Sequence, residues 1–337
     1  MTAVFAGHIF RGSDMDSAAQ AAEETRLVPA IAELCRREGV TALHGGLAAG
    51  ADILFAEAGA ALRLPVHVVL PFDADAFEAS SVAIGNPSDA PARWNARYRA
   101  ALAGAASLRV SSIDPPAWQR DAWYRTAFRE AAAAALLAAD RTGGTCLMLA
   151  ITDDGGSPGA GGTTTSEADW RARGRRLVSL PFAGARRPHG TNGARRHTGL
   201  LPVLFLRPAG PEGAARIAAI RPALGEARPR FALAGDGEAV LYDLASDAIA
   251  GARLASAPSL RVVCDFGLVC DEAGRPAEDA VLALHGAGNL AGTETGTVLA
   301  TEAFALEARY ESDTVAGLVP ADAFRGEDRV AALRLYR

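Results

Sequence analysis

The stretch His44-Gly45-Gly46-Leu47-Ala48-Ala49-Gly50-Ala51-Asp52 links an apolar segment to a helix-like segment that begins at Ile53. Glycines at a strand-to-helix turn let the backbone approach a bound anion and direct amide N–H groups towards it. The dipole of the following helix adds a favourable field. The pattern therefore predicts a parallel α/β sheet with a site for a nucleotide or a nucleotide-derived ligand. A turn that only caps the helix is the structural alternative.

Strand-like and helix-like segments alternate along the first half of the chain. The expected strands are Val4 to Ala6, Val40 to His44, Val66 to Leu70, Ser107 to Ser111, Cys146 to Ile151 and Leu177 to Leu180. The expected helices are Ala18 to Arg37, Ile53 to Leu62, Trp94 to Tyr98, Trp123 to Ala139 and Ala168 to Arg173. This order is typical of a Rossmann-like α/β domain with a parallel sheet.

A Gly- and Arg-rich segment, residues 184–199, has no apolar periodicity and is predicted to link a domain of residues 1–183 to one of residues 200–337. The strands expected after it are Leu201 to Leu206, Arg230 to Ala234, Ala239 to Tyr242, Leu260 to Leu268, Val281 to His285 and Val298 to Thr301. Helices are expected around Glu212 to Leu224 and from Ser246 to Ala255. The order strand, helix, hairpin, helix, strands indicates an α+β domain.

Composition narrows the classes of function. All 34 basic residues are arginine, which excludes a Walker-type lysine and a Schiff-base lysine. The four cysteines form no CxxC pair, so neither a zinc site nor a disulfide framework is expected. No apolar run approaches the roughly 20 residues that cross a bilayer, and no export signal is seen. A cytoplasmic protein without membrane contact is expected.

Nine arginines and no acidic residue lie between Arg171 and Arg207, although the whole chain has a net charge of −5. Such a stretch could bind the phosphates of nucleic acid in a salt-sensitive way. Few aromatic residues are interleaved with the arginines, so no base-stacking platform is indicated. A solvated linker is the favoured interpretation, and nucleic acid is not an expected partner.

Candidate ligand-binding residues lie at the ends of three expected strands, where an open parallel sheet places its ligand crevice. They are Gly7, His8, Gly45, Gly46, Gly50, Asp52, Asp153, Asp154, Gly155, Gly161, Gly162 and Thr163. Two glycine-rich loops that converge on one edge could hold a phosphate or a ribose between them. A flexible surface loop is the alternative for residues 153–156.

Residues Val4 to Leu180 resemble the SLOG superfamily, which includes the LOG phosphoribohydrolases and the DNA-processing protein A family. The run from Gly45 to Asp52 matches its GGxxxGAD element, and Gly161-Gly162-Thr163 is similar to its second loop. The resemblance implies that both loops hold a nucleotide-like ligand. LOG enzymes carry a PGGxGTxxE signature, in which the glutamate supports cleavage of a ribosyl bond. Here Glu167 lies one residue too far on, about 100° around a helix, which favours binding without hydrolysis.

Residues Leu201 to Arg337 resemble the class III nucleotide cyclase homology domain, which implies a ferredoxin-like, cyclase-type fold. The segment from Ala234 to Leu241 is similar to its GDG hairpin, and Gly296 to Phe304 to its GxVxxS-type segment. Cyclases need two aspartates to hold two metal ions, and an Asn and Arg pair to stabilise the transition state.

The match departs from the cyclases at the residues that carry their chemistry. Arg207 replaces the first metal aspartate, and His285 and Asn289 replace the asparagine and the arginine. Asp236, the one metal-type aspartate retained, also suits a tight turn. The domain is therefore expected to be catalytically inactive and to serve dimerisation or regulation. No metal site is predicted, and Mg²⁺ would bind only at an active nucleotide site.

The sequence thus predicts a sensor, in which a SLOG-like domain binds a nucleotide-derived ligand and an inactive cyclase-like domain forms a homodimer. One alternative is a hydrolase that cleaves the N-glycosidic bond of NAD or a nucleoside monophosphate, with Asp52, Asp154 or Glu167 as acid or base. His8 is a further catalytic candidate. Another alternative is a scaffold whose pockets are both vestigial.

Overall fold

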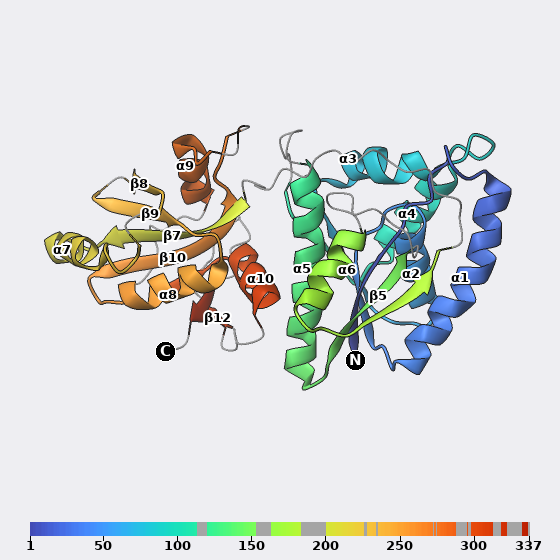
Figure 1. Ribbon diagram of the computed structural model, residues 1–337, viewed down its shortest axis with the longest axis horizontal. Helices are drawn as coiled ribbons and strands as arrows, with labels where there is room; N and C mark the ends of the chain where they lie inside the picture. The colour runs from blue at the N-terminus through green and yellow to red at the C-terminus, as the bar shows by residue number, and fades with distance from the viewer. Residues whose placement is uncertain are drawn as a thin grey trace. The chain divides into compact units, whose positions relative to one another are not determined.

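The protein is described here by a computed structural model. It describes residues 1–112, 120–152, 163–182, 200–225, 228–233, 235–271, 273, 275–287, 295, 298–312, 318–321 and 332–335. The chain divides into two compact units, Met1–Arg195 and Arg196–Arg337, which are considered one at a time (Figure 1). Within the described residues, no helix is long and apolar enough to span a membrane.

The first unit is built on a six-stranded sheet in which every pairing is parallel. Its strands are β1 (Thr2–Gly7), β2 (Ala42–Gly45), β3 (Val66–Leu70), β4 (Ser107–Val110), β5 (Cys146–Thr152) and β6 (Leu177–Pro181). The order in the sheet is β4-β3-β2-β1-β5-β6. The chain builds outward from β1 to β4 and then returns to the other side of β1, so the carboxyl ends of β1 and β5 flank a topological switch point.

Helices cover both faces of this sheet, which completes a Rossmann-like α/β unit. The helices α1 (Ser17–Arg37), α2 (Ala51–Ala61) and α4 (Arg93–Ala103) pack together on one side. On the other side α5 (Arg120–Thr142) crosses β1, β2 and β3, and α6 (Thr163–Ala172) packs on β5 (Figure 1). The alanines of α5 are largely buried, and their small side chains let this helix lie close to the strands. The core between the sheet and the first set of helices is anchored by Phe5 and Phe55, whose rings stack at 5.2 Å.

The sequence patterns predicted all six strands of this sheet, with ends that differ by at most two residues. The last helix was placed too late: α6 begins at Thr163, five residues before the expected start at Ala168. Its first turn is Thr-Thr-Thr-Ser, which carries no apolar periodicity. Three short helical turns were not expected, namely α3 (Ala74–Phe77), the π-helical turn η1 (Glu78–Val82) and the 3₁₀ turn η2 (Ala83–Gly85).

The second unit contains a seven-stranded mixed sheet. Its strands are β7 (Leu200–Pro208), β8 (Arg230–Leu233), β9 (Gly237–Leu241), β10 (Leu260–Leu268), β11 (Val298–Ala300), β12 (Leu318–Ala321) and β13 (Ala332–Leu335). The order is β12-β13-β11-β10-β7-β9-β8, in which β10 and β11 are parallel and the other pairs antiparallel. The first four strands, with the helices α7 (Pro211–Ile220) and α8 (Ala245–Ala255), follow the chain order βαββαβ.

One prediction for this unit was wrong. Val281 to His285 was expected to be a strand, but it lies within the helix α9 (Glu278–Ala287). The run Val-Leu-Ala-Leu is apolar enough for a buried strand, and a short apolar run does not separate the two states. The acidic first turn, Glu278 and Asp279, suits a helix N-terminus. Val281 and Leu284, three residues apart, pack on one face of the sheet, while α7, α8 and α10 (Glu302–Glu311) belong to the other.

Candidate ligand-binding site

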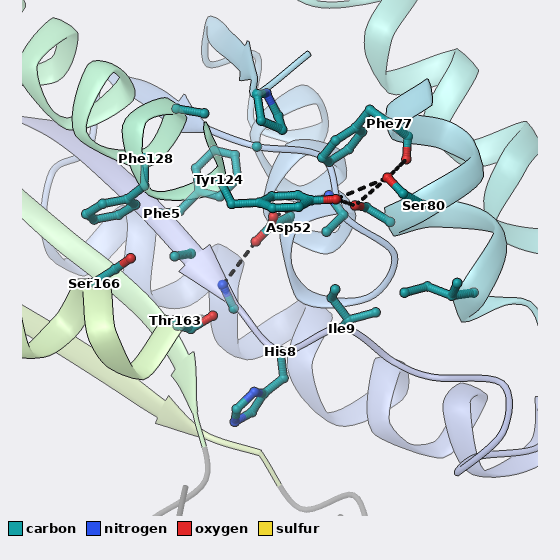
Figure 2. Close-up of a pocket in the computed structure, with 18 of the residues that line it drawn as sticks. Phe5, His8, Ile9, Asp52, Phe77, Ser80, Tyr124, Phe128, Thr163 and Ser166 are labelled. Carbon is teal, nitrogen blue, oxygen red and sulfur yellow. Dashed lines mark hydrogen bonds between the residues drawn. The ribbon is translucent and has the colours of Figure 1, made fainter. Parts of the chain in front are cut away.

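A cavity of about 520 Å³ lies in the first unit at the carboxyl ends of β1, β2 and β3. Its wall comes from the end of β1, the glycine turn after β2, the helical turns after β3, and the helices α5 and α6 (Figure 2). This is the edge at which open α/β sheets bind their ligands. The volume falls in the range of small-molecule sites.

The glycines of the turn are required by close packing. A Cβ at Gly7 would lie 2.2 Å from the Cβ of Ala51, and one at Gly45 would lie 2.5 Å from the ring of Phe5. Gly50 precedes α2 with a φ of +100°, a conformation that L-residues rarely adopt. These glycines therefore let β1, the turn and the start of α2 approach each other, whatever the cavity holds.

Asp52, in the first turn of α2, is the central polar group of the cavity. Its Oδ1 accepts a hydrogen bond from the Gly7 amide at 3.0 Å, and its Oδ2 accepts one from the Ala48 amide at 3.3 Å. Burial raises the pKa of this carboxyl group to about 7, although the two amides act in the opposite direction. A Cβ at Gly46 would lie only 3.2 Å from Oδ2. One amide from the end of β1 and one from the turn thus bind the protein's own carboxyl group, which the prediction of an anion held by backbone amides did not include.

His8 follows β1 directly and is buried, with its side chain on the cavity wall (Figure 2). Its ring meets the ring of Phe182 edge-on at a centroid distance of 5.3 Å. Its backbone N–H donates to the Ile151 carbonyl, and its carbonyl accepts from the Ala51 amide. The backbone of His8 therefore ties the end of β1 to β5 and to α2, which fixes the position of this residue at the edge of the cavity.

Three hydroxyl groups that the sequence analysis did not select gather at the β3 side of the cavity. The Tyr124 hydroxyl lies 2.5 Å from Ser81 Oγ and 3.1 Å from Ser80 Oγ, and the two serine oxygens are 3.3 Å apart. Figure 2 shows the tyrosine ring pointing across the cavity towards Ser80. Both serines belong to the π-helical turn η1, and such turns are frequent at functional sites. The sequence shows here only two adjacent serines in the segment after an expected strand. This pattern does not indicate which way their side chains point.

Of the second predicted loop, the structure describes Thr163, the first residue of α6. Thr163 and Ser166, in the first turn of α6, line the cavity. Asp153, Asp154, Gly155, Gly161 and Gly162 lie outside the described residues.

Glu167 is not among the described residues that line the cavity. Its Oε1 accepts hydrogen bonds from Thr152 at 3.2 Å and from Ser179 at 3.1 Å, and Arg171 lies 3.4 Å from Oε2. These partners place the carboxylate at β5 and β6, and none of them belongs to the Gly45-Gly46 turn.

The described charges around the cavity are mainly negative. Asp14, Asp52 and Asp121 line it, against a single arginine, Arg11. Within the described part of the chain, no cluster of three or more His, Cys, Asp or Glu residues could hold a metal ion. The described part of the wall therefore offers hydroxyl groups, aromatic rings and carboxyl groups in place of a set of cations.

In the second unit, Asp236 sits in the turn between β8 and β9 with a φ of +60°. It lines a shallow cavity together with Glu238, whose carboxylate pairs with Arg221 and Arg230. Arg207 lies near the end of β7, where its register partner on β10 is Arg261. Asn289 and the side chain of His285 lie outside the described residues.

Comparison with known proteins does not identify a family for this chain. No protein-family model matches the sequence, and no curated protein matches it either.

Proposed function

We propose that the first unit binds a nucleotide or a nucleotide-derived ligand in the cavity beside Asp52. The observation that carries this proposal is the position of the cavity, at the carboxyl edge of a parallel sheet and beside its switch point. Gly7, His8, Gly46, Asp52 and Thr163 from the predicted set all line it. The resemblance of the Gly45-to-Asp52 run to the SLOG superfamily supports the same class of ligand.

The contacts of Glu167 favour binding over hydrolysis. Its carboxylate is engaged by Thr152 and Ser179 at the sheet edge and does not line the described cavity. Glu167 therefore does not take the place of the glutamate that supports cleavage of a ribosyl bond in LOG enzymes.

A hydrolase is the second candidate, and Asp52 favours it. This carboxyl group lines the cavity and has a pKa of about 7, which suits a general acid or base at neutral pH. The bond to be broken would be the N-glycosidic bond of NAD or of a nucleoside monophosphate.

For the second unit we propose a ferredoxin-like, cyclase-type fold without cyclase activity, which forms a homodimer and transmits the response to the ligand. The chain order βαββαβ, with its four strands in the order β10-β7-β9-β8, supports the fold. Arg207 at the first metal position supports the loss of activity, because a cation there repels a divalent metal. The protein would act as a cytoplasmic sensor.

The test is to purify the protein and identify any co-purifying small molecule by mass spectrometry. The protein is then incubated with NAD, ATP, GTP and AMP in the presence of Mg²⁺ or Mn²⁺, and every species is followed. A bound nucleotide-like molecule and an unchanged pool support the sensor. Release of nicotinamide or a free base that stops in Asp52→Asn supports the hydrolase. Formation of a cyclic nucleotide would overturn the claim that the second unit lacks cyclase activity. If no nucleotide binds, the remaining interpretation is a scaffold with vestigial pockets.

A further inference from the structure

The hydroxyl cluster of Ser80, Ser81 and Tyr124 is held in place by the fold on one side and borders the cavity on the other. The Tyr124 ring packs edge-on against Phe72 at 5.4 Å and lies 6.3 Å from Phe77. Ser81 is buried, and all three hydroxyl-bearing residues line the cavity. The cluster is therefore positioned before any ligand arrives, which lowers the entropic cost of binding.

The hydrogen-bonding capacity of the cluster exceeds what its members use among themselves. Each hydroxyl group brings one proton and oxygen lone pairs, and its proton rotates to suit its surroundings. The three hydroxyl groups contact one another, and Ser80 also lies 3.4 Å from the Phe77 carbonyl. Lone pairs remain, and a rotated proton can be directed into the cavity. The cluster can thus serve a neutral group that both donates and accepts, as the edge of a nucleobase or a ribose diol does.

The remaining described charges argue against a polyphosphate in the same cavity. Arg11 is the one arginine on the described wall, which also carries the acidic residues Asp14 and Asp121. Asp52 takes up the Gly7 and Ala48 amides that would otherwise face an anion. A triphosphate carries several negative charges, and like charges in a partly dry site are costly.

We infer that this cavity holds the uncharged nucleoside part of the ligand, that Ser80, Ser81 and Tyr124 recognise its polar edge, and that added phosphates weaken binding. The inference rests on the proposed function and narrows its ligand class. Phe77 and Phe128, also on the wall, supply apolar surface for a planar base. The selectivity is thus assigned to side chains on the β3 and α5 side of the cavity, where the Ser81 carbonyl also accepts a hydrogen bond from the Ala49 amide of the glycine turn.

The ligand class is tested by calorimetric titration of the full-length protein with the four common nucleosides and with their 5′-mono- and 5′-triphosphates, with and without Mg²⁺. We expect at least one nucleoside to bind, with affinity falling as phosphates are added. If a triphosphate binds more tightly than its own nucleoside, the inference fails and the proposed function stands. If none of these compounds binds, and NAD also fails to bind in the same calorimetric assay, both fail.

The hydroxyl cluster is tested with Tyr124→Phe, which keeps the ring packing and removes one hydroxyl group. We expect the dissociation constant of the preferred nucleoside to rise by about 10-fold, the usual effect of one lost hydrogen bond in a desolvated site. Tyr98→Phe is the matched control, because the Tyr98 hydroxyl donates to the Ala74 carbonyl and does not line the cavity. An affinity of Tyr124→Phe within twofold of wild type, with the control unchanged, would refute the assignment.

Discussion

The clearest quantitative prediction concerns His44, a histidine enclosed in the core of the first unit. It lies on β2 with 4% of its surface exposed, and its ring stacks on that of His67 at 4.5 Å. Neither ring nitrogen of His44 hydrogen bonds to a described residue. Burial, and to a lesser extent the neighbouring His67, lower the pKa of His44 to about 3.

A histidine that stays neutral in the folded state makes the fold sensitive to acid. The unfolded chain takes up a proton below its pKa of about 6.5, whereas the folded protein resists it until about pH 3. The contribution of His44 to the free energy of unfolding is therefore complete above pH 6.5 and falls as the pH drops towards 3. The slope is ~1.4 kcal/mol per pH unit, and the full loss is roughly 5 kcal/mol.

His44→Leu removes the titrating ring and fills the site with an apolar side chain. We expect the free energy of unfolding of the variant, minus that of wild type, to increase by ~1.4 kcal/mol for each pH unit below 6. At pH 7.5 we expect the variant to be at least as stable, because two unpaired buried nitrogens are removed.

Urea denaturation between pH 4.5 and 8, followed by tryptophan fluorescence, measures this difference. All four tryptophans lie in residues 1–195, so the signal reports the first unit. The difference between two proteins is needed because Asp52, with its raised pKa, stabilises the fold as the pH falls and opposes His44. Met148→Leu is a buried, non-titrating control in the same sheet. A His44→Leu difference that stays constant across this pH range would refute the reasoning.

Three further predictions follow from the same structure. The free energy of unfolding of Asp52→Asn, minus that of wild type, should increase by ~1 kcal/mol per pH unit from pH 4 to 7, as measured by the same urea denaturation series. The reason is that the folded-state pKa of Asp52, about 7, makes the wild type lose stability as the pH rises over that range. Gly50→Ala should lower the free energy of unfolding by about 3 kcal/mol, since its Cβ would lie 2.6 Å from a backbone nitrogen at a φ of +100°. Gly39→Ala, at a φ of +62° with no neighbour within 4 Å, should cost only ~1 kcal/mol. Thr301→Ala should destabilise α10 by ~1–2 kcal/mol, seen as faster amide exchange, because it removes the helix cap and the donor to Asp265, whereas Thr301→Ser should restore both.

The four central strands of the first unit, β3, β2, β1 and β5, could be predicted because they are largely buried and therefore read as short apolar runs between turn residues. Val66 to Leu70 followed by a proline is such a run, and the structure places β3 at those residues. The helix α9 could not be predicted in the same way. Its apolar run of four residues, Val281 to Leu284, fits either state. Its helical conformation is stabilised by packing of Val281 and Leu284 on the sheet, which the sequence does not display.

The candidate site also contains residues that could be predicted from the sequence and residues that could not. The turn from Gly45 to Asp52 was selected because glycine spacing is visible in a sequence, and the structure shows that much of this spacing serves close packing and the seating of the Asp52 carboxyl group. The hydroxyl groups of Ser80 and Tyr124 meet only because β3, its helical turns and α5 converge across 44 residues of chain. Residues that fix the backbone of such a turn can recur in proteins that bind different ligands, because they specify the sheet edge. Ligand choice then depends on the side chains that the rest of the fold brings to that edge. For this protein, titration of Tyr124→Phe is therefore a sharper test of the ligand than any change in the glycine turn.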